Sequence, residues 1–155
     1  MTILTLVRHG ETDWNSGGRI QGSTDIPLND TGRGQARELA ERLATEYAGS
    51  EVVIVSSDLS RAAETADVIA AALGTTVSRR MPGLQERSYG DAEGLDVATF
   101  YETYGPWHAA DVPNAETWPV VRERALVALA LGGAETPAGV DVITVAHGAL
   151  IREVI

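Results

Sequence analysis

The sequence contains no cysteine and no lysine, and each absence excludes a kind of chemistry. Without cysteine the chain cannot form disulfide bonds, use a thiolate nucleophile or build a cysteine-based metal site. Without lysine it cannot use a Schiff base or the lysine of a phosphate-binding P-loop. All 12 basic residues are arginine, so any anion site must be made from arginine, histidine and backbone N–H groups.

Long apolar runs and an excess of positive charge are missing as well. The longest uninterrupted apolar run covers residues 125–131, which is too short to cross a bilayer. No basic segment precedes the apolar residues that follow Met1, so we expect no signal peptide and a cytoplasmic protein. The formal net charge of −10 disfavours nucleic acid and membranes as partners. Because 44% of the residues are hydrophobic, the chain can still bury a core.

Strand and helix patterns alternate along the 155 residues, a length that fits one domain. Continuous apolar segments predict fully buried strands at residues 3–7, 52–55 and 141–146, with a weaker candidate at 75–78. Apolar residues at helical spacing predict helices at residues 33–47, 58–73 and 118–131, with another beginning at Ala149. The alternation predicts a three-layer α/β/α fold with a mostly parallel central sheet.

Two long irregular segments interrupt this pattern, at residues 9–30 and 80–117. Irregular segments of this length in one domain are usually functional, and we expect residues 80–117 to form a cap over the site. Ser57 or Asp58 is expected to cap the second predicted helix, and Thr117 the third.

Two histidines occupy equivalent positions in the predicted sheet. His9 follows the strand at 3–7 and His147 follows the strand at 141–146, and a glycine comes directly after each. Because the carboxyl ends of parallel strands meet at one edge, we expect the two histidines to face one another. The alternative is that each ring only satisfies buried backbone groups.

Two arginines accompany them. Arg8 precedes His9, and the turn at the strand end can bring both side chains to the sheet edge. Arg61 falls in the first turn of the helix at 58–73, where a cation opposes the helix dipole. A bound anion would remove that conflict; the alternative is a surface arginine that bonds to Asp58.

These residues belong to motifs that resemble the signature of the histidine phosphatase superfamily, also called the phosphoglycerate mutase-like family. The motif segments occur in family order, and the resemblance covers nearly the whole chain. They are residues 6–15 (LVRHGETDWN), 21–36 with Gln21-Gly22, 56–66 (SSDLSRAAETA), 84–94 and 145–148 (VAHG). The resemblance implies the phosphoglycerate mutase-like α/β/α fold.

The resemblance also implies a role for each residue. His9 would be the nucleophile that forms a phosphohistidine, with Arg8, Arg61 and a protonated His147 binding the phosphoryl oxygens. Glu86 would be the general acid and base, with Asp91 and Glu93 as rivals for that role. The substrate-binding residues would be Asn15, Gln21, Gly22, Arg87, Tyr89 and Gly148. No metal and no cofactor are expected, and His108 is expected to be solvated.

The family contains phosphatases and phosphoglycerate mutases, and the loop at 86–90 (ERSYG) resembles that of the mutases. Against a mutase, Val97 stands where mutases carry a lysine, and residues 88–121 contain no arginine or lysine. We therefore favour a phosphomonoester hydrolase that acts on a small phosphorylated metabolite. A cofactor-dependent phosphoglycerate mutase and a catalytically silent phosphate-binding homologue remain alternatives.

The sequence does not identify the substrate. Aromatic residues of the predicted cap would form either an apolar wall of the site or the core of the cap: Phe100, Tyr101, Tyr104, Trp107 and Trp118.

The resemblance raises one expectation about the end of the chain. Family members continue past the second His-Gly through further strands, so we expect this chain to lack C-terminal strands of the fold. The strand at 3–7 would then be an unprotected edge, and four apolar residues would be poorly covered: Ala149, Leu150, Val154 and Ile155. Either a longer protein or a partner chain would supply the cover, and a homodimer is one such arrangement.

Overall fold

Four parallel strands form the sheet in the computed structural model, which describes residues 2–155. The strands are β1 (Leu4–Arg8), β2 (Val52–Ser56), β3 (Val77–Arg80) and β4 (Asp141–Ala146). Their order is β1-β4-β2-β3, and every neighbouring pair is parallel. All four predicted strands are therefore present, including the weaker one.

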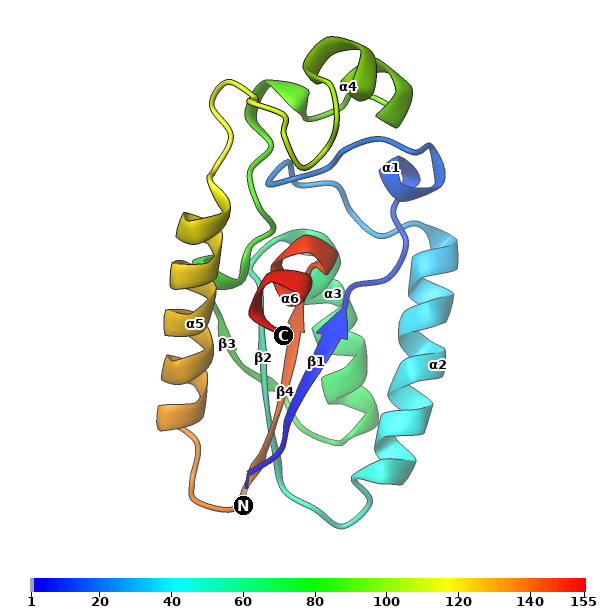
Figure 1. The fold of residues 1–155 in the computed structure, drawn as a ribbon. Helices are drawn as coiled ribbons and strands as arrows, with labels where there is room; N and C mark the ends of the chain where they lie inside the picture. Colours follow the sequence, from blue (N-terminus) through cyan, green and yellow to red (C-terminus); the bar gives the residue numbers. More distant parts are fainter. Residues whose placement is uncertain (1) are drawn as a thin grey trace.

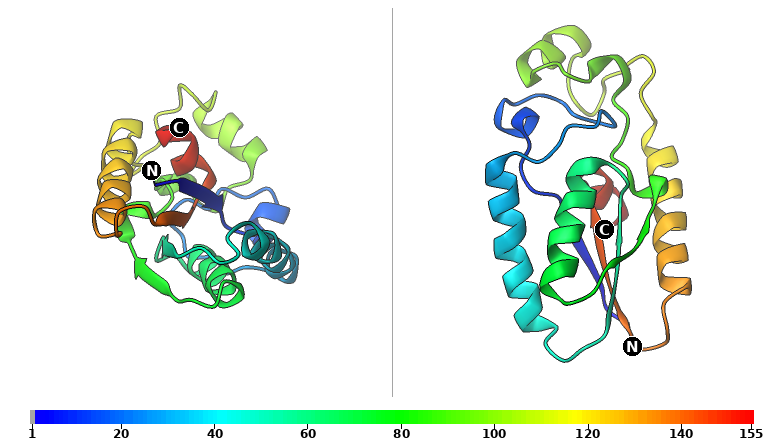
Figure 2. Two further views of the ribbon diagram at one scale, coloured as in Figure 1. Left: turned by 90° about the horizontal axis from the view of Figure 1, so that it is seen from below. Right: turned by 180° about the vertical axis from the view of Figure 1, so that it is seen from behind.

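Helices cover both faces of this sheet and confirm the three-layer α/β/α fold (Figure 1). One face carries α2 (Asp30–Glu46) and α3 (Ser60–Ala72), and the other carries α5 (Trp118–Ala134) and α6 (Gly148–Val154). Figure 2 shows the same layers from below and from behind. No helix within residues 2–155 is long and apolar enough to cross a membrane. The cytoplasmic location stays a prediction.

Alternating side chains of the central strand β4 supply the two cores. Ile143 and Val145 pack with residues of α2 and α3, whereas Val142 packs on the opposite face with Ala128 of α5. This is the two-residue period of a strand covered on both sides. Because α5 also covers the start of α6, Leu150 is only 1% exposed, and the expectation that it is poorly covered is wrong. Ala149, expected to be uncovered as well, is buried, and Val154 is half-buried, whereas Ile155 is 87% exposed, as expected.

Strand β1 departs from the prediction of a fully buried strand. Only Val7 is buried, while Ile3 and Leu4 are 54% and 47% exposed. The reason is position, because within residues 2–155 β1 pairs with β4 alone and forms one edge of the sheet. The expected absence of C-terminal strands stays a prediction.

The two irregular segments contain short helices. The first holds α1 (Asp13–Ser16), and the second holds η1 (Pro82–Leu84), η2 (Gly90–Ala92) and α4 (Val97–Tyr104). Asp96 caps α4 by accepting a 2.8 Å hydrogen bond from the Thr99 N–H. Its β-branched and aromatic residues have modest helix propensity, which is why the sequence pattern did not reveal it. Figure 1 places α4 beyond the carboxyl ends of the strands.

The N-terminus of α3 is capped from a distant loop, so the prediction of Ser57 or Asp58 as its cap is wrong. The N-cap position is Leu59, which has no side-chain cap bond. Instead, Asp25 Oδ1 accepts hydrogen bonds from the Ser60 N–H at 2.8 Å and from its hydroxyl at 2.6 Å. Thr117 does occupy the N-cap position of α5, but without a side-chain cap bond.

Candidate active site

The sheet brings the two histidines together at its carboxyl edge, as predicted. Arg8, the last residue of β1, lies opposite Ala146, the last residue of β4. The His9 N–H continues this ladder by donating to the Ala146 carbonyl at 3.1 Å. The centroids of the His9 and His147 rings are consequently 5.1 Å apart, close enough for one tetrahedral anion to contact both.

The protonation state of His9 follows from its hydrogen bond. Its Nδ1 lies 2.6 Å from the Gly10 carbonyl oxygen, which can only accept, so Nδ1 carries the proton. Burial and the positive charges of Arg61 and Arg8 lower the pKa of His9 to about 4, although the bond to Gly10 opposes them. At neutral pH the ring is therefore uncharged, and Nε2 has a free lone pair.

His147 is fully buried, and both of its ring nitrogens lack a hydrogen-bond partner in residues 2–155. Buried polar atoms without partners are costly, and they mark a position where a ligand can supply the missing bonds. Burial and the charge of Arg61 lower the pKa of His147 well below its usual value. The protonated form of His147 stays a prediction for the anion-bound site. A phosphate dianion beside the ring would raise the pKa.

Arg61 is fully buried in the first turn of α3. Its two terminal nitrogens donate to the carbonyls of Thr24 at 2.8 Å and Gly22 at 2.7 Å, while its Nε has no partner. The surface alternative is excluded, because Arg61 does not contact Asp58. The guanidinium shapes the loop at residues 22–24, and its Nε–H is left to donate to a ligand.

Arg8 and Gly148 meet between the two strand ends. A Cβ on residue 148 would lie 3.3 Å from Nε of Arg8, so glycine leaves the room that the arginine occupies. Arg8 is exposed and lines the same cavity as His9 and Arg61.

Glu86 binds the start of α6, the helix that follows His147. Its Oε2 accepts from the Ala149 N–H and its Oε1 from the Leu150 N–H, both at 2.9 Å. Each carboxylate oxygen has two lone pairs, so Oε2 keeps one that can carry a proton. Arg124 holds the loop in place by donating to the Glu86 carbonyl at 3.1 Å and to the Gln85 carbonyl at 2.7 Å.

The two rival carboxylates are placed elsewhere. Glu93 accepts from the N–H groups of Ser23 at 2.9 Å, Thr24 and Tyr89, both at 3.0 Å. Gly22, at φ 55°, sits so close that a Cβ there would overlap the Glu93 carboxylate. Glu93 therefore stabilises the loop at residues 22–24. Asp91 is exposed and bonds to the Asn114 amide at 2.9 Å.

Asn15 and Gln21 offer neutral donors. Asn15 Oδ1 accepts from the Thr12 N–H at 3.1 Å, and Gln21 Oε1 accepts from the Thr12 hydroxyl at 2.6 Å. Their NH₂ groups are thereby the atoms left to donate, and both residues line the cavity.

Tyr89 and Arg87 of the mutase-like loop line different cavities. Tyr89 is buried and lines the cavity of His9, and burial raises the pKa of its phenol to about 12. Arg87 instead stacks between the rings of Tyr89 (4.7 Å) and Trp118 (4.2 Å) and donates to the Glu116 carbonyl at 2.8 Å. It lines a neighbouring cavity with Trp118 and His108, so its substrate-binding role stays a prediction. His108 is exposed, as expected.

The cap aromatics mostly form a core. Phe100 is 2% exposed and packs against Tyr104 and Trp107, whereas Tyr101 is exposed. Of the five predicted aromatics, Trp107 alone lines the cavity of His9.

The cavity of His9 has a volume of about 270 Å³, and its lining carries an excess of positive charge. It is lined by four arginines (Arg8, Arg19, Arg61 and Arg152) and one carboxylate (Glu86), in a chain with net charge −10. Sequence reasoning missed Arg19 and Arg152. Arg152 falls one helical turn after Gly148, a spacing that could have revealed it.

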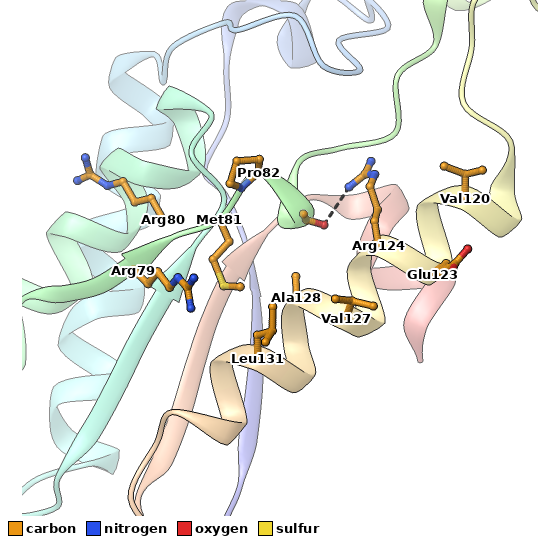
Figure 3. A pocket seen from close by; sticks show the side chains of 11 residues that line it. Arg79, Arg80, Met81, Pro82, Val120, Glu123, Arg124, Val127, Ala128 and Leu131 are labelled. Atoms are coloured by element: carbon orange, nitrogen blue, oxygen red, sulfur yellow. Dashed lines mark hydrogen bonds between the residues drawn. The ribbon is translucent and has the colours of Figure 1, made fainter.

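A larger cavity lies between α5 and the segment from Arg79 to Gly83 (Figure 3). Its volume is about 560 Å³, and apolar side chains such as Met81, Val127 and Leu131 line it. It contains no histidine, so its size does not make it the reactive site. Within residues 2–155 there is also no group of three or more His, Asp or Glu side chains that could hold a metal ion.

A neutral histidine acceptor that shares a cavity with the buried Arg61 and the exposed Arg8 is a site for a tetrahedral anion. Residues 4–155 match the model of the histidine phosphatase superfamily (branch 1), and the chain belongs to this family.

Relatives carry both phosphatase and mutase names. The chain is 42% identical to "Uncharacterized phosphatase PhoE" of Bacillus subtilis, over 98% of this chain and 75% of the relative. It is 39% identical to "Phosphoglycerate mutase-like protein 4" of Arabidopsis thaliana, over 96% and 67%. A mycobacterial glucosyl-3-phosphoglycerate phosphatase solved with VO3 superposes with a TM-score of 0.85 at 34% identity, over 97% and 78%.

Proposed function

We propose that the protein is a phosphomonoester hydrolase that acts on a small phosphorylated metabolite through a phosphohistidine on His9. The observation that carries the proposal is the state of His9: a neutral ring whose Nε2 lone pair is free, beside the arginines and His147. Family membership and the phosphatase-named relatives support it.

The first half-reaction transfers the phosphoryl group to the protein. Nε2 of His9 attacks phosphorus in line, the N–P bond forms, and the bond to the leaving oxygen breaks. Arg8, Arg61 and His147 bind the equatorial oxygens, whose charge they stabilise in the loose transition state. Glu86, entering protonated, gives its proton to the leaving alkoxide.

The second half-reaction returns the protein to its starting state. Glu86, now ionised, takes a proton from water, and the water oxygen attacks phosphorus. The N–P bond breaks, phosphate leaves, and His9 recovers its lone pair. Because no step requires a metal, activity should survive EDTA.

Mutase activity is the second candidate, favoured by the loop at 86–90 and by the mutase-named relative. A mutase must retain the phosphoryl group and return it to the substrate, whereas a hydrolase passes it to water. The absence of arginine and lysine from residues 88–121 disfavours the mutase. A silent homologue is disfavoured because His9, Arg61, His147 and Glu86 are all present at one site.

A product assay with 3-phosphoglycerate and p-nitrophenyl phosphate separates these candidates. A hydrolase releases inorganic phosphate from both compounds. A mutase instead converts 3-phosphoglycerate to 2-phosphoglycerate and depends on the bisphosphate. Absence of both products for every phosphomonoester tested would leave only the silent homologue.

A further inference from the structure

Two residues outside the cavity of His9 hold the segment that carries Glu86. Arg124 lies in α5, and Glu116 directly precedes Thr117, the N-cap residue of that helix. Neither is among the described residues that line the cavity of His9. Two parallel hydrogen bonds join their side chains, from Arg124 Nε to Glu116 Oε1 at 2.9 Å and from Nη2 to Oε2 at 2.8 Å. This bidentate geometry gives an arginine–carboxylate pair both strength and a fixed orientation.

Arg124 spends its remaining donors on backbone carbonyls of the same segment. Nη1 donates to the Gly83 carbonyl at 3.0 Å, the bond drawn in Figure 3, and to the Gln85 carbonyl at 2.7 Å. Nη2 donates to the Glu86 carbonyl at 3.1 Å. A guanidinium has five N–H groups, so all five are bonded. Lysine has three donors on a single nitrogen and cannot reproduce this fork.

Glu116 binds the segment at its other end. Its Oε2 accepts from the Ser88 N–H at 2.8 Å, and its backbone N–H donates to the Ser88 carbonyl at 2.9 Å. Burial alone would raise the pKa of Glu116, but the bonds from Arg124 and Ser88 outweigh it and hold that pKa below its usual value. The backbone of residues 83–88 is therefore held by one charged pair.

The side chain of Glu86 is fixed separately, by the N–H groups of Ala149 and Leu150 at the start of α6. With its backbone held by Arg124, the residue is anchored at both ends. A general acid must lie within hydrogen-bond reach of the oxygen that it protonates, and a displacement of about 1 Å can cost a hundredfold in rate. Anchoring at both ends meets this requirement before a substrate binds.

We propose that Glu116 and Arg124 are positioning residues for the general acid: as one ion pair they fix the backbone that carries Glu86 and so direct its carboxyl toward the leaving oxygen. The proposal rests on the role of Glu86 in the proposed function. A pair that only stabilised the fold would affect every substrate alike, whereas a pair that positions the acid affects most the substrates whose leaving group needs a proton.

The test is the ratio of kcat/KM for p-nitrophenyl phosphate to kcat/KM for phenyl phosphate, two substrates of nearly the same shape. Phenolate needs the proton, because an ordinary phenol has a pKa of about 10, whereas p-nitrophenolate leaves almost unaided. Since kcat/KM compares the free protein with the transition state of P–O cleavage, it excludes the later hydrolysis of the phosphohistidine. The ratio is measured for wild type, Glu116→Gln, Arg124→Lys and Glu86→Gln.

We expect Glu86→Gln to raise this ratio about thirtyfold and each variant of the pair about tenfold, because a displaced acid loses part of what a deleted acid loses. Combined with Glu86→Gln, either variant of the pair should raise the ratio no further, because the acid that it positions is already absent. Urea unfolding establishes that each variant is folded in the assay. Where one of the two pair variants does not fold, the other decides.

Glu135→Gln and Arg79→Lys are the matched controls. This pair has the same chemistry, with 2.7 Å between Arg79 Nη1 and Glu135 Oε1, and Glu135 is the C-cap residue at the opposite end of α5. Arg79 also lines the apolar cavity that Arg124 lines. We expect both controls to keep the wild-type ratio.

An equal rise of the ratio in the controls would reduce the effect to the loss of any ion pair on α5 and overturn the inference. An unchanged ratio in the folded variants Glu116→Gln and Arg124→Lys would overturn it as well, provided that Glu86→Gln raises the ratio. An unchanged ratio in Glu86→Gln itself would instead contradict the general acid of the proposed function.

Discussion

Arginines line both the apolar cavity beside α5 and the cavity of His9, but within residues 2–155 only those of the apolar cavity form ion pairs. In the apolar cavity beside α5, every arginine has a carboxylate partner: Arg79 with Glu135 at 2.7 Å, Arg80 with Asp67 at 2.6 Å and Arg124 with Glu116 at 2.8 Å. In the cavity of His9, the arginines bind carbonyls or nothing. Charge that the fold neutralises is structural, whereas charge left uncompensated is available to a ligand.

The comparison also separates size from function. The apolar cavity is about twice as large, 560 against 270 Å³, yet no histidine lines it. Arg61, whose Nε has no partner, lines the smaller cavity, and His147, whose two ring nitrogens have no partner, lies beside His9 of that cavity. Unsatisfied buried polar atoms are therefore the better guide to the reactive site.

The largest effect is expected from His9→Ala, which removes the nucleophile. Hydrolysis of p-nitrophenyl phosphate should fall by about a thousandfold or more, because the remaining groups cannot form the covalent intermediate. Steady-state release of p-nitrophenolate measures it. Retention of a tenth of the activity would contradict the role of His9.

Arg61→Gln should cost both activity and stability. Loss of one preorganised donor to the phosphoryl oxygens should lower kcat by about a hundredfold or more. The carbonyls of Gly22 and Thr24 would lose their partners, which should lower the free energy of unfolding by about 1–3 kcal/mol. Kinetics and urea unfolding provide the two readouts. A stable variant with wild-type kcat would show that Arg61 serves neither purpose.

Glu86→Gln should discriminate between leaving groups. Alkyl phosphates need a proton on the departing oxygen and should react about a hundredfold more slowly, whereas p-nitrophenyl phosphate should be affected much less. The kcat values of both substrates are compared in the same preparation. Equal loss for both would remove Glu86 from the role of general acid.

Acidification should weaken the fold through His9. The pKa of His9 is about 4 in the folded chain and has the ordinary histidine value of 6.5 in the unfolded chain, so between these pH values the unfolded chain binds more protons. Stability should therefore be fully present above pH 6.5 and decline as the pH falls toward 4, by about 3 kcal/mol from His9. Urea unfolding between pH 7.5 and 4.5 measures it, and His9→Phe should show a shallower decline. Parallel declines in the two proteins would contradict the assignment.

The smallest effect on kcat/KM is expected from a substitution in the apolar cavity beside α5. Leu131→Gln changes a side chain that is 44% exposed on α5, away from the histidines, and should leave kcat/KM within about twofold of wild type. A loss comparable to that of Glu86→Gln would show that the two cavities are coupled.

Much of this arrangement could be predicted from local patterns, because apolar runs specify the strands and topology specifies where they end. That reasoning placed His9 and His147 together, and the motif supplied Glu86. It did not find the cap of α3 by Asp25, which lies far away in the sequence, or the helix α4, whose residues have modest helix propensity. The exposed edge at β1 was expected only from the family resemblance. Arg19 was missed because a single loop arginine has no periodic signal, whereas the spacing of Arg152 from Gly148 was overlooked.

The most direct test of the account is to detect phosphate on His9. Wild-type protein mixed with p-nitrophenyl phosphate and quenched within one turnover should gain the mass of one phosphoryl group. The label should map to the peptide that contains His9, survive alkali and be lost in acid, and it should be absent from His9→Ala. Turnover without any protein-bound phosphate, or with phosphate on another residue, would contradict the central claim.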